Sequence, residues 1–129
     1  MAGSDIALRV AEHWLVSARR CPSPNRDARP PGIEPALIVI HGISLPPGRF
    51  GTGDVDALFT NCLDPAAHPD YPELCGMRVS SHLLIDRGGE CIQYVPFSER
   101  AWHAGRSHWC GRDGCNDFSI GIELEGTDE

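Results

Sequence analysis

The sequence is short of positive charge. Its 129 residues include 11 Lys and Arg against 18 Asp and Glu, which gives a formal net charge of -7 at pH 7. Proteins that bind a phosphate backbone need clustered Lys and Arg to displace its counterions. This deficit argues against nucleic acid as a partner.

Long apolar runs and a secretory signal are also missing. No run approaches the roughly 20 residues of a membrane helix, so we expect no membrane partner. Residues 1–16, MAGSDIALRVAEHWLV, lack the basic start and the apolar segment of a signal peptide. The length and the 41% hydrophobic content suit one folded domain, residues 1–129. We therefore expect a cytoplasmic, single-domain protein.

Six cysteines are present, and their even number would suit disulfides in a small secreted domain. In the cytosol, however, thiols are kept reduced, so free cysteines are expected. Only Cys110 and Cys115 have a spacing that suits a metal, and no second short-spaced pair follows them. We favour two loop thiols, with a reversible redox pair as the weaker alternative.

Four segments predict regular structure. Residues 36–41, ALIVIH, are continuously apolar, which is typical of a strand buried on both faces, so we expect a central strand. Asp54 is a suitable cap for a short helix, whose apolar face would comprise Val55, Leu58, Phe59 and Leu63. Segments 82–86 and 90–95 flank Arg87-Gly88-Gly89 and predict a β-hairpin. Residues 118–126, FSIGIELEG, alternate as in a half-buried strand, with Ile120, Ile122 and Leu124 as the apolar side.

Two side chains stand out chemically. His41 follows the buried run and precedes a glycine, and strand ends of this kind open into binding crevices. A neutral imidazole there suits a metal ligand or a general base, although a packed structural histidine is the alternative. Glu123 and Glu125 share one face of their strand, where a carboxylate beside a metal would activate bound water. The alternative is a charged, solvent-facing strand surface.

The order of several segments resembles the AmpD-type N-acetylmuramyl-L-alanine amidases, which are cytoplasmic bacterial enzymes of peptidoglycan recycling. The resemblance runs from about Trp14 to the end of the sequence. It rests on the segments WLVSARRCPSPN, LIVIHGISLPPGRFG, VDALFTNCLDPAAHP, RVSSHLLIDRGGECIQYVPFSERAWHAG and CNDFSIGIELEGTD.

The resemblance implies a fold and a reaction. The fold would be α/β, a single domain in which helices flank a mixed β-sheet. The activity would be that of a zinc amidase, which cuts the amide between the lactyl group of 1,6-anhydro-N-acetylmuramic acid and L-alanine of the stem peptide. Its partners would be anhydromuropeptides and other peptidoglycan fragments, and its cofactor zinc.

The resemblance also implies site residues. Zinc would bind His41, and Glu123 would be the catalytic acid-base residue, because Ser81 stands where phage relatives have a tyrosine. The implied substrate-binding residues are Gly42, Arg78, His82, Trp102 and His103. Gly42 replaces a frequent Asn, and Gly114 replaces a peptide-binding arginine, so two contacts of the family are in doubt.

A catalytic zinc takes three protein ligands. The resemblance implies that the other two, a histidine and an aspartate, together with an oxyanion-stabilising lysine, lie beyond Glu129. It thus implies a domain that is truncated at its C-terminus and lacks a helix over one face of the sheet. The alternative function is a non-catalytic module that binds muropeptides or peptidoglycan without cutting them.

Overall fold

The computed structural model describes residues 8–127; the outermost residues of the expected domain 1–129 lie outside the described residues. Within this range, no helix is long and apolar enough to cross a membrane. The elements in chain order are β1 (Val10–Ala11), β2 (Trp14–Leu15), β3 (Arg19–Arg20), β4 (Arg26–Ala28), β5 (Leu37–Ile43), α1 (Asp54–Phe59), α2 (Tyr71–Leu74), β6 (Leu83–Ile85), β7 (Cys91–Gln93), β8 (Glu99–Ala101), β9 (His108–Trp109), β10 (Arg112–Asp113), the 3-10 helix η1 (Cys115–Asp117) and β11 (Ser119–Glu125).

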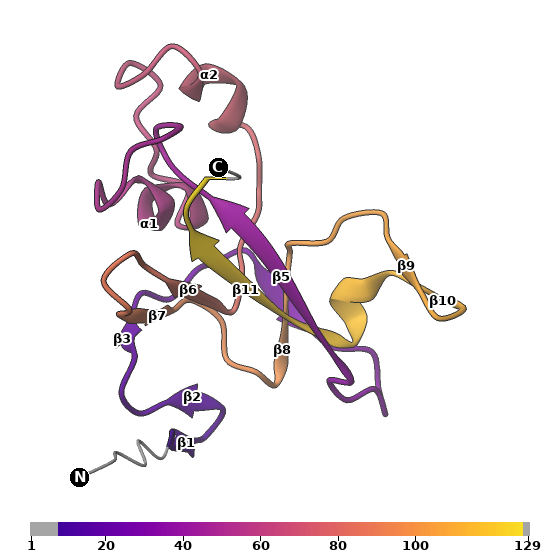
Figure 1. Ribbon diagram of the computed structural model, residues 1–129. Helices are drawn as coiled ribbons and strands as arrows, with labels where there is room; N and C mark the ends of the chain where they lie inside the picture. Colours follow the sequence, from indigo (N-terminus) through magenta and orange to yellow (C-terminus); the bar gives the residue numbers. More distant parts are fainter. Residues whose placement is uncertain (1–7, 128–129) are drawn as a thin grey trace, which may run out of the picture.

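A five-stranded sheet organises the fold, in the order β3-β7-β6-β11-β5. Strand β11 runs parallel to both β5 and β6, whereas β6 and β7 are antiparallel. Figure 1 shows β5 and β11 side by side, with their arrowheads toward α1 and α2. Three two-stranded pairs, β1-β2, β4-β8 and β9-β10, surround this sheet. The mixed sheet with few helices confirms the predicted fold class.

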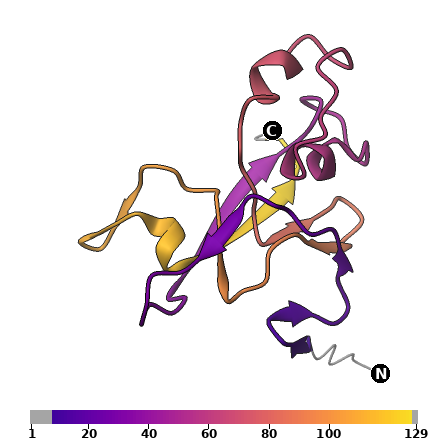
Figure 2. The same ribbon diagram turned by 180° about the vertical axis from the view of Figure 1, so that it is seen from behind.

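Helix α1 packs against the sheet through a core that it shares with Leu84 of β6 and Ile92 of β7; the view from behind places it beside the ends of β5 and β11 (Figure 2). Its predicted apolar residues, Val55, Leu58, Phe59 and Leu63, are all buried, although Leu63 follows the helix. The Phe59 ring meets the Tyr94 ring edge-on, with centroids 4.9 Å apart. Apolar burial of this kind is the main stabilising contribution to a small domain.

The expected helix cap is wrong. Gly53, with φ 81°, is the N-cap, and Asp54 is the first helical residue. The left-handed conformation suits glycine, which has no Cβ to clash. The Asp54 carboxylate instead accepts a hydrogen bond from the Tyr71 hydroxyl at 2.5 Å, and so ties α1 to α2. Burial and this bond raise the pKa of Tyr71 to about 12.

The β-hairpin is confirmed. Strands β6 and β7 pair antiparallel, with Ile85 opposite Cys91. Of the two turn glycines, Gly89 has the positive φ, 85°. The Asp86 carboxylate accepts hydrogen bonds from the Gly88 and Glu90 N–H groups, a side-chain turn that closes the connection.

The prediction of a central strand buried on both faces is wrong for β5. It lies at the edge of the sheet. Its side chains alternate between half-buried and exposed, and Ile38 and Ile40 are 59% and 54% exposed. A continuous apolar run shows that a strand can be covered on both sides, but the coverage itself depends on distant segments.

Strand β11 is half-buried as predicted, but the apolar side is the exposed one. Ser119, Gly121 and Glu123 are buried, whereas Leu124 is 43% exposed. Parallel pairing places these buried residues on the same face as alternate residues of β5. A polar face of β11 therefore lies inside the protein.

Candidate active site

Two strands bring His41 and Glu123 together. They are directly paired in the parallel β5-β11 ladder, so their side chains project from the same face of the sheet. His41 lies two residues before the end of β5, and Glu123 two residues before the end of β11. The structure thus combines the two residues that the sequence singled out for chemistry.

Glu123 is a buried carboxyl with an unusual environment. Its side chain is 9% exposed, and its Oε2 atom has no hydrogen-bond partner among the described residues. Burial raises the pKa of Glu123 to about 7 because the charged form loses its hydration. A carboxyl with a pKa near neutrality can accept and return a proton at working pH.

His103 lies over the same face and links to His41. His103 Nδ1 lies 2.9 Å from His41 Nε2, and its Nε2 lies 3.1 Å from the Ser119 hydroxyl. Burial lowers the pKa of His41. Burial, with the charges of His41, His82 and Arg29, lowers the pKa of His103 to about 3. Both imidazoles are therefore neutral near pH 7, as a metal ligand or proton acceptor must be.

Gly121 makes this placement of His103 possible. A Cβ at position 121 would lie 2.6 Å from two carbons of the His103 ring. Atoms cannot approach that closely, so only glycine lets the imidazole pack against the strand. A glycine inside a strand is a signal of such close approach that the sequence analysis did not use.

His82, for which the resemblance implies a substrate-binding role, is packed inside the protein. The side chain is fully buried. Its Nδ1 accepts a hydrogen bond from the Gly121 N–H at 3.1 Å, and its Nε2 donates one to the Glu99 carbonyl at 2.8 Å. Burial lowers the pKa of His82 to about 4. This geometry describes a neutral histidine that ties β11 to β8, with no face left for substrate.

Three predicted substrate-binding residues do lie together. Arg78, Trp102 and His103 line a depression of about 380 Å³. Arg78 is exposed, and its guanidinium donates only a long 3.4 Å hydrogen bond to the Cys75 carbonyl, which leaves most of its donors directed to solvent. Gly42 lies elsewhere, because strand alternation puts it on the opposite face of β5 from His41.

A second depression, of about 330 Å³, adjoins the first across His103 and Ala104. His41 and the exposed Trp109 are among its lining residues. His103 thus separates a depression that contains Arg78 from one that contains His41. We refer to these two neighbouring depressions together as the groove.

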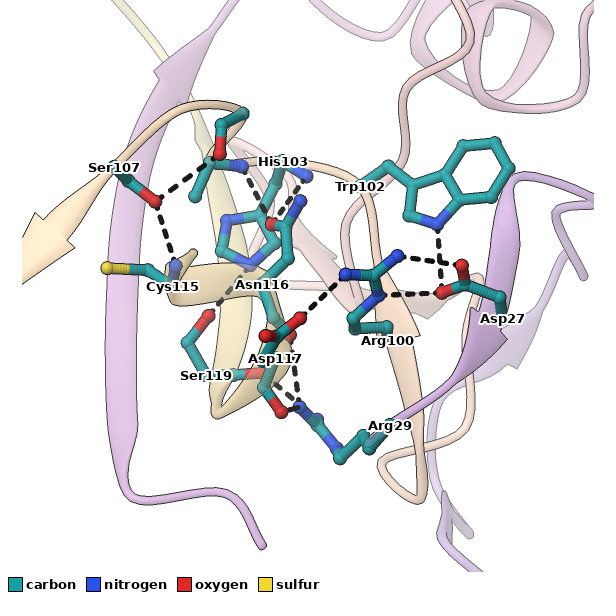
Figure 3. A network of polar contacts seen from close by, with 12 residues as sticks. Asp27, Arg29, Arg100, Trp102, His103, Ser107, Cys115, Asn116, Asp117 and Ser119 are labelled. Carbon is teal, nitrogen blue, oxygen red and sulfur yellow. Dashed lines mark hydrogen bonds and ion pairs between the residues drawn. The ribbon is translucent and has the colours of Figure 1, made fainter. Parts of the chain in front are cut away.

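The groove wall has polar supports that the sequence analysis missed (Figure 3). The Asn116 Oδ1 atom accepts hydrogen bonds from the N–H groups of His103 and Ala104, at 3.1 and 2.9 Å. Asp27 accepts one from the Trp102 indole at 3.2 Å. Asp27 and Trp102 are 75 residues apart in the chain, so no local pattern could reveal the pair.

His41 is the one implied zinc ligand that lies within the described residues. No group of three His, Cys, Asp or Glu side chains within residues 8–127 could hold a metal ion. A catalytic zinc takes three protein ligands, and His41 supplies one suitable imidazole. Cys110 is exposed and Cys115 is buried, and both are free thiols.

Comparison with known proteins gives close relatives. The chain is 63% identical over 119 residues to the 1,6-anhydro-N-acetylmuramyl-L-alanine amidase AmpD of Escherichia coli K12, an alignment that covers 92% of this chain and 65% of that protein. It is 54% identical over 120 residues to the protein of the same name from Haemophilus influenzae, with 93% and 65% covered. The chain spans 62% to 65% of the AmpD relatives it matches.

Solved structures agree with this. The crystal structure of a selenomethionine AmpD derivative matches with a TM-score of 0.92 and 59% identity, over 94% of this chain and 68% of that one. The solution structure of Citrobacter freundii AmpD matches with a TM-score of 0.61 and 59% identity, over 94% and 65%. A profile of one protein family matches residues 31–129. The chain therefore belongs to the N-acetylmuramoyl-L-alanine amidase family.

Proposed function

We propose that this chain carries part of the active site of a bacterial amidase that cuts the bond between the lactyl group of N-acetylmuramic acid and L-alanine of the stem peptide. The names of the AmpD relatives support the 1,6-anhydro form of the sugar as substrate. The observation that carries the proposal is the buried carboxyl of Glu123, whose Oε2 atom has no hydrogen-bond partner within residues 8–127 and which is paired in register with His41. The proposed setting is peptidoglycan recycling in the cytoplasm.

Glu123 would perform the proton transfers. Its carboxylate accepts a proton from the attacking water as the water oxygen bonds to the lactyl carbonyl carbon. It then returns that proton to the alanine nitrogen as the C–N bond breaks, so the products are a free lactyl carboxyl group and a free amine. The pKa of about 7 supports both halves of this exchange near neutral pH.

Zinc is part of the proposal, with His41 as one ligand. The partly buried, neutral imidazole of His41 suits such a role. The resemblance places the remaining ligands beyond Glu129. When bound, zinc would lower the pKa of a bound water and polarise the carbonyl.

Arg78, Trp102 and His103 would hold the substrate. An arginine can bind a stem-peptide carboxylate through two parallel hydrogen bonds, and Arg78 presents an exposed guanidinium in the first depression. Trp102 and His103 would form the wall beside the scissile bond. Gly42 lies on the opposite face of β5 from His41, and His82 is buried. In this proposal, both residues would therefore affect substrate binding through their neighbours rather than by direct contact.

The test compares Glu123→Gln with Glu125→Gln in the natural full-length chain. The product is stem peptide released from anhydromuropeptide, measured by mass spectrometry. We expect Glu123→Gln to lower kcat by about 100-fold to 10,000-fold, because the amide accepts no proton. Glu125→Gln is the matched control, since its remaining amide oxygen can still accept from the Gly51 or Arg87 N–H groups. Cleavage that survives Glu123→Gln would remove the assigned role.

A second candidate is a muropeptide-binding module without catalysis. It is favoured by one observation, that residues 8–127 contain no three-ligand metal group. It predicts that the protein binds anhydromuropeptide equally well with and without a chelator, and releases no peptide. Calorimetry with and without EDTA, run beside the cleavage assay, separates the two functions.

A further inference from the structure

We propose that Asp27 is a positioning residue for the groove, which holds the Trp102 indole in the wall that binds the muropeptide. The inference rests on the proposed function, because it assigns Asp27 a part in binding the same substrate. Asp27 itself does not line the depression of Arg78 and Trp102. It acts through the residues that do.

The first step is the ion pair between β4 and β8. Asp27 and Arg100 are directly opposite in this antiparallel pair. The Arg100 Nε and Nη2 atoms donate to the two Asp27 carboxylate oxygens, each at 2.7 Å, the parallel two-bond geometry in which Arg pairs best. Hydrogen bonds from Arg100 and Trp102 hold the pKa of Asp27 below its usual value, despite some burial.

The second step anchors this pair to the strand that carries Glu123. The Arg100 Nη1 atom donates to the Asp117 carboxylate at 2.6 Å. Asp117 ends η1, which leads directly into β11. Figure 3 shows Arg100 between the two carboxylates. The Asp27 carboxylate is thus fixed from β8 and, through Arg100, from the start of β11.

The third step is the contact with the groove. The Asp27 Oδ1 atom that accepts from Arg100 also accepts from the Trp102 Nε1–H at 3.2 Å. The Trp102 backbone N–H donates separately to the Ser80 hydroxyl at 3.1 Å. The Ser80 bond holds the backbone, so the Asp27 bond is the one that sets the direction of the indole. Trp102 is only half-buried, so the Asp27 bond is a specific restraint on the indole in addition to packing.

The test compares Asp27→Ala with the control Glu90→Ala in the natural full-length chain. Glu90 is an exposed carboxylate that pairs with Arg19 at 3.5 Å, on the turn between β6 and β7. The first readout is the indole proton of Trp102 in a ¹H–¹⁵N spectrum, assigned with Trp102→Phe. We expect Asp27→Ala to speed its exchange with water about tenfold, because its hydrogen-bond acceptor is gone. Glu90→Ala should leave the exchange unchanged.

The second readout is kinetic. Asp27→Ala should raise KM for anhydromuropeptide about threefold to tenfold and leave kcat within about twofold, because only the binding wall moves. A fall in kcat with constant KM would indicate a merely structural effect on Glu123, and would overturn the inference. Asp27→Asn retains one acceptor oxygen, so its KM should lie between those of Asp27→Ala and the wild type. It also keeps the test valid if Asp27→Ala fails to fold.

The outcomes separate this inference from the proposed function. If the wild type neither cleaves nor binds anhydromuropeptide, the proposed function fails and the inference fails with it. If the wild type cleaves, Trp102→Ala raises KM and both Asp27 variants match the wild type, only the inference fails. If Trp102→Ala leaves KM unchanged, the indole is no part of the binding wall, and the inference is overturned for that reason.

Discussion

The two faces of the β5-β11 pair invert the usual arrangement of a sheet. One face carries Ser119, Gly121, Glu123 and His41, and it is covered by His103 and by the core around α1. The other face carries isoleucine and leucine side chains, of which Ile38, Ile40 and Leu124 are 43% to 59% exposed. On β11 the polar side is therefore the buried one, whereas the inner side of β5 is apolar apart from His41.

The two faces differ in the free energy of burying their side chains. Burying a carboxyl without a partner is unfavourable, because water no longer solvates the charge. Such groups persist where chemistry needs them, and the rest of the fold supplies the compensating stability. The inner face therefore has the character of a site, whereas the outer face presents exposed apolar side chains within residues 8–127.

The largest expected effect is on the inner face. Glu123→Gln should raise the free energy of unfolding by about 2 to 3 kcal/mol at pH 8 and change it little at pH 4.5, because the pKa of Glu123 is raised to about 7. A raised carboxyl pKa favours the neutral form in the folded state. Its stabilising contribution is full below about pH 4.5 and is lost as pH rises through 7. Urea unfolding of both proteins, with a chelator present, measures the difference at each pH.

The difference between the two proteins isolates Glu123, because the buried histidines titrate alike in both. Its control is Glu125→Gln, a carboxylate on the same strand that accepts two backbone hydrogen bonds. The free energy of unfolding of that variant should not exceed the wild-type value at pH 8. A Glu123→Gln difference that stays constant from pH 4.5 to 8 would mean that Glu123 is ionised without penalty, and the contrast between the faces would lose its main support.

The next effect comes from adding one methyl group on each face. Gly121→Ala should cost about 1 to 3 kcal/mol, because the new Cβ would lie 2.6 Å from the His103 ring. Gly42→Ala, on the opposite face of the neighbouring strand, meets no atom within 4 Å in the described part of the chain, so its cost should be near zero. Thermal unfolding of the two variants measures both. Equal losses would show that the clash at His103 is relieved without cost.

Part of this arrangement could be predicted from sequence. The hairpin followed from a turn flanked by apolar segments, and the helix face from the spacing of Val55, Leu58 and Phe59, because both are local patterns. His41 and Glu123 were found as single residues, and the family resemblance supplied their roles. Their direct pairing depends on the register between β5 and β11. The two residues are 82 positions apart in the chain, so no local sequence pattern predicts that they are paired.

The rest depends on contacts between distant segments. The apolar run in β5 suggested burial on both faces, yet coverage of Ile38 and Ile40 requires another segment to lie over them. The support of Trp102 by Asp27 likewise joins residues 75 positions apart. Periodicity shows which residues share a face of a strand, but the packing of the whole chain decides which face is buried.

The smallest expected effect is on the outer face. It is measured by making the same substitution, Ile to Val, once in the core and once on the outer face. Ile92→Val removes one methylene from a core residue that is 2% exposed, and it should cost about 0.5 to 1.5 kcal/mol. Ile40→Val, at a residue 54% exposed, should stay within about 0.5 kcal/mol of the wild type. Both substitutions keep a β-branched residue in a strand, so β propensity cancels.

Urea unfolding at one protein concentration, repeated at a tenfold higher one, measures both variants. If Ile40→Val cost as much as Ile92→Val at both concentrations, the outer face would be covered within the chain itself in solution. If its cost rose with concentration, a second molecule would be covering that face, because only association makes stability depend on concentration. A small, concentration-independent cost would leave the outer face as solvent-exposed strand surface, in contrast to the buried polar face behind it.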